Sequence, residues 1–217
     1  MNLDLYCKLM NEVKMKTTAI AEIRNGTKST SFVITNIEFC CLQIRKIIEL
    51  VALSSLVANK NQFERLMIKF EHLWNLKEIL KDIKKLNPDF YPQPITEIPS
   101  SDPIAKIEWK HIDKGYMTID DIYLIYSKCG KILHSDNPFG AKTDLEYYKR
   151  QIDLWLDKIV KLLNCHLIKI IGDDNLYLIH MKENKDELVH GYVFAPHSPN
   201  EPKTDSFPHQ SPAKKHY

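Results

Sequence analysis

The chain has 217 residues, of which 44% are hydrophobic and 27% are charged, and this is enough to bury one core of ordinary size. Basic residues exceed acidic ones by only two (30 against 28), so no global positive field indicates a nucleic-acid or membrane surface. No apolar stretch reaches the roughly 18 residues of a membrane span, and the N-terminus lacks a basic start followed by an apolar core, so we expect a cytoplasmic protein without a membrane partner.

Cysteine and histidine spacing argues against a disulfide framework or a metal site. The cysteines number five, an odd count, and no pair shows Cys-x-x-Cys spacing. The histidines likewise lack the spacing of metal ligands, so the sequence predicts no metal ion and no cofactor. Buried thiols in a reducing compartment are expected for all five cysteines: Cys7, Cys40, Cys41, Cys129 and Cys165.

The first part of the chain predicts helices. Apolar and polar residues alternate at helical spacing over 3–23, and the polar segment 24–30 then supplies a turn. Apolar residues cover so much of the next helix, 31–58, that it should be central and buried. A third, amphipathic helix follows over about 63–83, and the prolines after Asn87 end it.

Two more helices follow a loop-rich connector that extends to about residue 117. We predict one short strand within this connector, at 107–109. Thr118 and the acidic residues after it form a helix start, and this helix should end near Leu133. An Asn-Pro-Phe-Gly turn then leads to a helix over 143–163 with a long apolar stripe.

From residue 166 the apolar pattern changes to that of strands. Three strand-like stretches, at 166–171, 176–181 and 187–194, are separated by polar turns and predict an antiparallel meander. The last residues are rich in Pro, Ser, His and Lys, a composition typical of disordered chains. We therefore predict a mainly α fold: a helical bundle over 1–165, a small C-terminal antiparallel β-meander over 166–195 packed on the bundle, and a flexible tail over 196–217.

Three charged residues interrupt the apolar second helix. Glu38, Arg45 and Glu49 are spaced by seven and four residues, which places them on one stripe of the helix. Charges on so apolar a helix are costly to desolvate, so we expect them either to pair or to face a pocket. A structural ion pair between Arg45 and Glu49 is one interpretation, and a functional site is the other.

A second polar group lies where the helix after Thr118 ends. His134 follows two apolar residues there, and the negative end of the helix dipole favours its charged form. Its neighbours can hold a phosphate, a water molecule or the imidazole itself. The alternative is that His134 and Asn137 only cap the helix and brace the turn. The neighbours are Lys128, Ser135, Asp136 and Asn137.

These residues resemble the HEPN (higher eukaryote and prokaryote nucleotide-binding) superfamily. There an Arg, a polar residue and, a few positions later, a His form the ribonuclease site of a helical dimer. The resemblance covers roughly residues 31–165 and involves the Glu/Arg set and Lys128-x5-His134. Lys128 stands where the family has Arg, and Cys129 replaces the polar residue, so only His134 matches. Three segments of this chain, 43–59, 87–92 and 129–139, also resemble segments of uncharacterised bacterial proteins.

The resemblance implies a homodimer that acts on or senses RNA or nucleotides, as a metal-independent ribonuclease of a bacterial defence or toxin system. The residues expected to carry catalysis are His134 as acid or base, Arg45 and Lys128 as phosphate-charge stabilisers, and Asn137 as an orienting group. Binding or bracing roles fall to Glu38, Glu49, Ser135 and Asp136. The alternative is a non-catalytic module that binds a partner protein through its sheet edge or its tail.

The two hypotheses predict different surroundings for the polar residues. Catalysis requires His134 and Arg45 to share a cleft that solvent can reach. An interaction module predicts that both side chains are fully paired and sealed.

Overall fold

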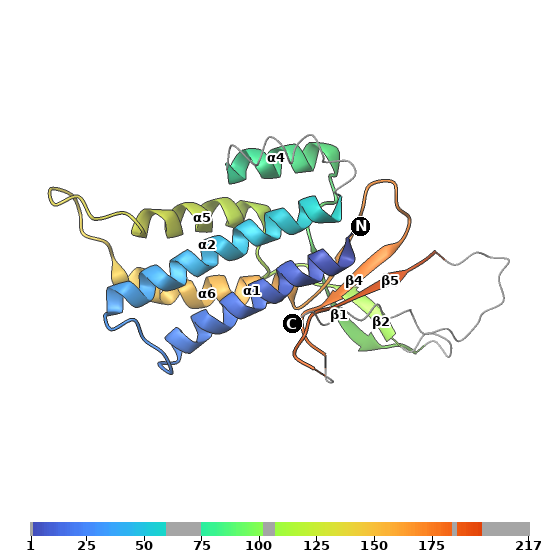
Figure 1. The fold of residues 1–217 in the computed structure, drawn as a ribbon, viewed down its shortest axis with the longest axis horizontal. Coiled ribbons are helices and arrows are strands. Elements are labelled where there is room, and N and C mark those ends of the chain that lie inside the picture. The colour runs from blue at the N-terminus through green and yellow to red at the C-terminus, as the bar shows by residue number, and fades with distance from the viewer. Residues whose placement is uncertain (1, 60–74, 102–106, 184–185, 197–217) are drawn as a thin grey trace.

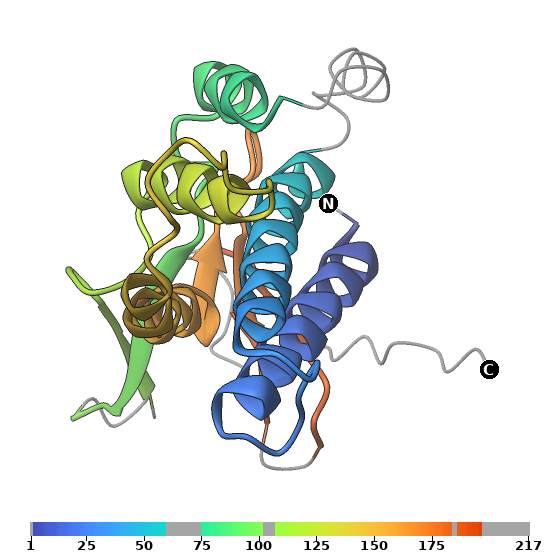
Figure 2. The same cartoon turned by 90° about the vertical axis from the view of Figure 1, so that its left-hand side faces the viewer.

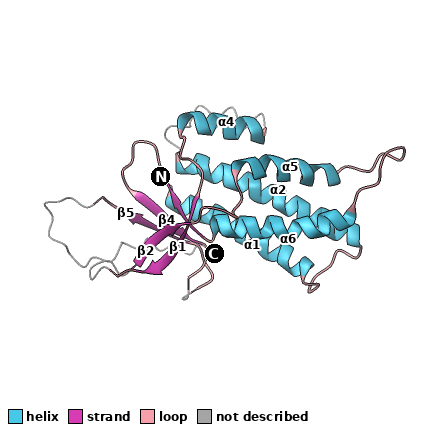
Figure 3. Ribbon diagram, turned by 180° about the vertical axis from the view of Figure 1, so that it is seen from behind, coloured by secondary structure: helices cyan, strands magenta, loops and turns pink. Residues whose placement is uncertain are grey.

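The computed structural model describes residues 2–59, 75–101, 107–183 and 186–196. Helices and strands gather at opposite ends of the molecule (Figures 1 and 3). The helices are α1 (Leu3–Arg24), α2 (Val33–Ala58), α4 (Leu76–Leu86), α5 (Ile119–Ile132) and α6 (Leu145–Leu163). The strands are β1 (Gln93–Pro99), β2 (Ile107–His111), β3 (Cys165–Ile168), β4 (Leu176–His180) and β5 (His190–Phe194).

The starts of α5 and α6 follow from their capping residues. The Thr118 hydroxyl accepts a hydrogen bond from the backbone N–H of Asp121 at 3.1 Å, and the Asp121 carboxylate accepts one from the backbone N–H of Thr118 at 3.0 Å. This capping box satisfies two amides that α5 would otherwise leave unpaired. Asp144 caps α6 by accepting from the backbone N–H of Tyr147 at 2.9 Å. Both predicted helix starts are confirmed.

Helix α2 is the centre of the bundle, as predicted. It begins two residues later than expected because Ser31 has a left-handed backbone, with φ of 81°. Most of its apolar side chains are buried, and Ile44 and Ile48 fully so; Val33, Ile34 and Leu42 are exposed. Helices α1, α4, α5 and α6 pack around it (Figure 2). The third predicted helix, over about 63–83, is not continuous, because Asn75 is extended and caps α4, which covers only the last part of that range; residues 63–74 lie outside the described part of the chain.

The sheet is larger than the predicted C-terminal meander. Strands β3, β4 and β5 form the meander, but β1 and β2 from the connector extend it to five antiparallel strands in the order β2-β1-β3-β4-β5. The short strand predicted at 107–109 is confirmed as part of β2. The description as a mainly α fold with a sheet built only from residues 166–195 is therefore corrected to a mixed α and β fold.

Strand β1 escaped prediction because it contains Pro94 and ends at Pro99, and proline lacks the N–H that a central strand needs. The register explains how the sheet accommodates them. Only residues 93–94 of β1 pair with β3, whereas residues 95–99 pair with β2. Apart from Pro94, whose carbonyl also accepts from the backbone N–H of Ile112 at 3.0 Å, each residue of β1 is paired on one side only, so most of the strand behaves as an edge.

The sheet curls strongly. The rings of Trp109 on β2 and Phe194 on β5 meet edge to face with centroids 4.9 Å apart, although three strands separate β2 from β5. Neighbouring strands are about 4.8 Å apart, so a flat sheet would hold these rings far from one another. The curled face encloses a small second core of Ile95, Leu167 and Leu178.

The opposite face of the sheet packs on the helices through a buried histidine. His166 on β3 is fully buried, and its Nδ1–H donates to the carbonyl of Leu163 at 2.7 Å. Because a carbonyl only accepts, this contact fixes the tautomer, and Nε2 accepts from the hydroxyl of Tyr6 on α1 at 2.9 Å. Burial lowers the pKa of His166 to about 4, so the imidazole is neutral.

Several expectations concern the cysteines, the membrane and the tail. All five cysteines are free thiols; Cys165 is half-buried and the other four are buried. Among the described residues, no helix has both the length and the apolar character of a membrane span. The flexible tail was predicted over 196–217, and all of it except Pro196 lies outside the described part of the chain.

Candidate functional site

Arg45 and Glu49 do contact the helix after Thr118, and both are held by Tyr126. The guanidinium of Arg45 lies over the Tyr126 ring, 3.8 Å from its centroid, and its Nη1 donates to the Tyr126 carbonyl at 3.3 Å. The Tyr126 hydroxyl donates to the Glu49 carboxylate at 2.9 Å. No ion pair joins Arg45 to Glu49 or to another carboxylate of the described residues. The predicted structural bridge within α2 is therefore replaced by a contact between two helices.

A glycine makes room for this arrangement. A Cβ atom at Gly130, one turn after Tyr126 on α5, would lie 2.5 Å from Nη1 of Arg45. Any larger residue would push the guanidinium aside. Gly130 therefore positions Arg45, although glycine is a poor residue for a helix interior.

Arg45 lines a groove that is open to solvent. A pocket of about 560 Å³ is lined by described residues from α2, α5 and the start of α4: Arg45, Asn75, Leu76, Lys77, Tyr123, Tyr126 and Ser127. A second hollow of about 360 Å³ is lined by Lys77, Lys81, Lys84, Lys85 and Tyr123. Because the two share Lys77 and Tyr123, they form one continuous depression, which we call the α4–α5 groove.

The groove is rich in positive charge. The α4 lysines follow one another at intervals of four, three and one residues, which places them on one side of the helix, and all four are exposed. Lys85 is 3.7 Å from the carboxylate of Asp82, so its charge is partly balanced. Lys77, Lys81, Lys84 and Arg45 have no ion-pair partner among the described residues. The described lining residues include two tyrosines but no carboxylate.

His134 and its neighbours are not among the described residues that line the groove. The loop 133–144 projects from the end of α5 (Figure 1), and His134 is exposed within it. Asp136 accepts hydrogen bonds from the backbone N–H and the hydroxyl of Thr143, which lower the pKa of its carboxyl. Asn137 accepts from the backbone N–H of Phe139 at 3.0 Å. Ser135 is exposed. These contacts brace the loop, and that of Asn137 agrees with the part of the alternative that expects Asn137 to brace the turn; no side-chain hydrogen bond from His134 to α5 is found among the described residues.

Among the described residues, no hydrogen bond, ion pair or ring contact joins the remaining predicted residues to Arg45. Lys128 follows Tyr126 by two residues, about 200° around α5, and its ammonium lies 5.6 Å from the ring centroid of Tyr147 on α6. Glu38 is half-buried two turns before Arg45, about 10 Å along α2. Of the eight predicted residues, the structure therefore brings together only Arg45 and Glu49, through Tyr126.

Sequence reasoning missed the tyrosines and lysines of the groove. The lysine spacing on α4 was a readable signal, since charges at intervals of four and three residues share a helix side. The contribution of Tyr123 and Tyr126 had no such signal, because it depends on how α5 packs against α2.

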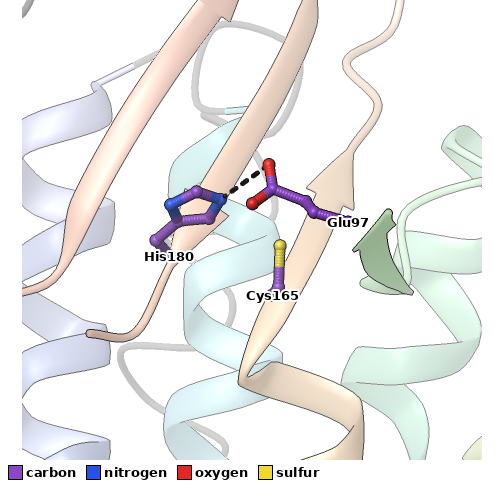
Figure 4. A group of neighbouring side chains, drawn as sticks. All are labelled: Glu97, Cys165 and His180. Atoms are coloured by element: carbon purple, nitrogen blue, oxygen red, sulfur yellow. Dashed lines mark ion pairs between the residues drawn. The ribbon is translucent and has the colours of Figure 1, made fainter. Parts of the chain in front are cut away.

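A separate cluster of ligand-type side chains lies on the curled face of the sheet. Glu97 of β1, Cys165 of β3 and His180 of β4 converge there (Figure 4), with ligand atoms that all lie within 4.8 Å of one another. Burial, with the charge of Glu97, raises the pKa of the Cys165 thiol to about 12. The cluster was missed because its members come from three strands and show no spacing in the sequence.

Comparisons with known proteins assign no role to the α4–α5 groove or to the cluster on the sheet. No protein-family model, curated protein or solved structure matches the chain. The HEPN resemblance stays a prediction, and the function proposed next follows from the geometry of the groove.

Proposed function

We propose that the protein binds single-stranded RNA in the α4–α5 groove. The observation that carries this proposal is the guanidinium of Arg45, stacked on Tyr126 at one end of a groove whose other end is lined by lysines. Positive charge along a groove and aromatic or guanidinium surfaces on which bases stack are the two features that single-strand binding requires.

The lysine side of the groove suits a phosphate backbone. Lys77, Lys81 and Lys84 span seven residues of α4, about 10 Å at 1.5 Å per residue. Each is an exposed ammonium on a long stem, so it can follow phosphates whose spacing varies. The expected contact is therefore electrostatic and independent of base sequence.

The Arg45 end of the groove suits a base or a phosphate held with defined geometry. One face of Tyr126 is covered by the guanidinium, so the guanidinium plane and the half-buried ring of Tyr123 are the surfaces left for stacking. The Arg45 N–H groups that do not contact Tyr126 can donate to a phosphate in pairs. RNA rather than DNA is chosen because of the HEPN resemblance.

Binding is better supported than cleavage. Metal-independent cleavage needs a proton-transfer group beside the phosphate that Arg45 holds. The described residues that line the groove include no histidine, aspartate or glutamate, and His134 lies in the projecting loop. A ribonuclease built on His134 and Arg45 is thus the narrower proposal, with less support from the geometry.

The experiment is a fluorescence anisotropy titration with a labelled oligouridine of about 12 nucleotides, a length within the ~4–16 that one single-strand binding fold covers. We expect binding by the wild type and weaker binding by Arg45→Gln and Tyr123→Ala. Lys8→Gln, on exposed α1 surface outside the groove, is the matched control and should bind as the wild type does. Equal binding by all four proteins would contradict the proposal.

The same samples test cleavage. End-labelled RNA incubated in EDTA with wild type and with His134→Ala separates the two proposals. Intact RNA with tight binding supports a binding protein. Cleavage that His134→Ala abolishes would instead establish the ribonuclease.

One observation favours a protein-interaction module as the second candidate. Phe139 is 97% exposed between Pro138 and Gly140 at the projecting loop, and a large aromatic side chain in that position is a typical anchor for a partner. Affinity capture with wild type and Phe139→Ser as bait tests it. A partner retained only by the wild type would support the module, whereas identical capture would contradict it. The predicted homodimer is tested by sedimentation of the same proteins.

A further inference from the structure

We propose that Glu97, Cys165 and His180 bind one divalent transition-metal ion of the zinc class on the curled face of the sheet. The three side chains come from β1, β3 and β4 and point toward a common centre (Figure 4). This place is separate from the α4–α5 groove, so the proposal stands or falls independently of RNA binding.

The strand register brings the three residues to one face. Cys165 and His180 are direct partners across the β3–β4 ladder. Glu97 pairs with Trp109 across the β1–β2 ladder, and it shares a face with Ile95, which belongs to the small core of that face. Side chains two residues apart on a strand share a face, so Glu97 and Ile95 lie together.

The distances fit a metal ion. Zinc binds sulfur at about 2.3 Å and nitrogen or oxygen at about 2.0–2.2 Å, so the corners of its tetrahedron are about 3.3–3.7 Å apart. Nε2 of His180 already lies 3.3 Å from a carboxylate oxygen of Glu97. The longest separation among the three ligand atoms is at most 4.8 Å, about 1 Å more than a tetrahedral edge, so small side-chain rotations suffice to close it.

His180 has the surroundings of a metal-binding imidazole. Its Nδ1 faces the carboxylate of Glu183 at 3.8 Å, while its Nε2 faces Glu97 and Cys165. Nε2 is buried and has no hydrogen-bond partner among the described residues, because its approach to Glu97 lacks hydrogen-bond alignment. A carboxylate behind one imidazole nitrogen, with the other nitrogen turned to the ion, is the usual arrangement at zinc sites.

The donor set selects the class of ion. One thiolate, one imidazole and one carboxylate suit zinc or a neighbour in the transition series, whereas magnesium and calcium prefer oxygen ligands alone. Three protein ligands leave the fourth tetrahedral position for water or a further ligand. The ring of Tyr192, 5.4 Å from that of His180, provides an aromatic wall beside it.

A metal ion here would join two parts of the sheet where backbone pairing is weakest. Strands β1 and β3 pair through residues 93–94 only, and Glu97 lies beyond the end of that ladder. A bond from Glu97 through the ion to Cys165 would therefore attach the β1–β2 hairpin to the meander. The ion is expected to act as a structural cross-link, with a direct effect on stability.

The test uses Co²⁺ as a spectroscopic probe on the full, reduced, chelator-treated protein. We expect one equivalent to bind with a thiolate-to-cobalt charge-transfer band and with the intense visible absorption of tetrahedral cobalt. Cys165→Ser should lose the charge-transfer band, and Glu97→Gln and His180→Gln should lose tight binding. Glu183→Gln should weaken affinity about 10–100-fold, as removal of a supporting carboxylate does. Cys7→Ser, a buried thiol on the other face of the sheet, is the matched control.

Stability provides a second readout. Zn²⁺ at about 100 times its dissociation constant should raise the thermal midpoint of the wild type by about 5–10 °C and leave that of Glu97→Gln unchanged. Glu97 is exposed and glutamine has its shape, so this variant folds without the ion. A charge-transfer band that persists in Cys165→Ser, the absence of any such band in the wild type, or an equal thermal shift in Glu97→Gln would overturn the proposal.

Discussion

Replacing Lys81 and Lys84 by glutamine should halve the salt dependence of RNA binding. Four groove cations lack an ion pair among the described residues: Arg45, Lys77, Lys81 and Lys84. If each meets one phosphate, the slope of log affinity against log salt is about −2.8, from −0.7 per contact on a single strand. A fourfold rise in salt then weakens the wild type about 50-fold and the double variant, with a slope of about −1.4, about 7-fold.

The assay is the anisotropy titration repeated at several salt concentrations. Glutamine keeps the length and helix propensity of lysine, so α4 should remain folded. Replacing Lys8 and Lys110, which are exposed on α1 and β2, removes the same charge outside the groove and is the control. Equal slopes for the groove variant and this control would refute the assignment of the phosphates to α4.

Three further predictions concern single residues. Gly130→Ala places a methyl group 2.5 Å from Arg45 Nη1, so RNA should bind more weakly, and the slope of log affinity against log salt should be shallower by about 0.7. Alanine should at the same time stabilise the helix by up to about 1 kcal/mol. Unchanged RNA binding would contradict the positioning role of Gly130. The pKa of His166 is about 4 in the folded protein and about 6.5 in the unfolded chain, so the unfolded chain binds a proton first as the pH falls. The contribution of neutral His166 to the free energy of unfolding is therefore fully present above about pH 6.5, and about 2 kcal/mol of it is lost between pH 7 and 5. Urea unfolding at both pH values should show His166→Gln losing less than the wild type, and an equal loss would refute this. Gly191→Ala brings a methyl group 2.6 Å from Leu3 of α1 and should lower the free energy of unfolding by about 1–3 kcal/mol in the same assay, with RNA binding unchanged. Unfolding at the same urea concentration as the wild type would contradict this prediction and show that α1 shifts to accommodate the methyl group.

The helices could be predicted because their signals are local. A capping pair such as Thr118 and Asp121 lies within one helical turn, and the apolar stripe of α2 repeats within each turn. Strand β1 could not, because Pro94 argues against a paired strand unless the register is known. The register of the complete sheet shows that residues 93–94 of β1 pair with β3 and residues 95–99 pair with β2.

The candidate site was predicted in part for the same reason. That Arg45 and Glu49 needed partners followed from their place on an apolar helix, but the partner, Tyr126, is 77 and 81 residues away in the chain. Catalysis required His134 beside Arg45, with Arg45 in place of the arginine that the HEPN family has at the position of Lys128. In the structure α5 ends at Ile132, about 9 Å along the helix from Tyr126, and among the described residues no hydrogen bond or ring contact joins His134 to Arg45.

The most direct test of RNA binding in the α4–α5 groove is to locate the RNA on the protein. An oligonucleotide of 4-thiouridine, cross-linked by long-wavelength light and analysed by mass spectrometry of the attached peptides, reports which side chains touch a base. We predict cross-links at Tyr123, reduced in Arg45→Gln. Cross-links confined to the loop 133–144 or to the sheet, with none on α5 between residues 119 and 132, would contradict the proposal.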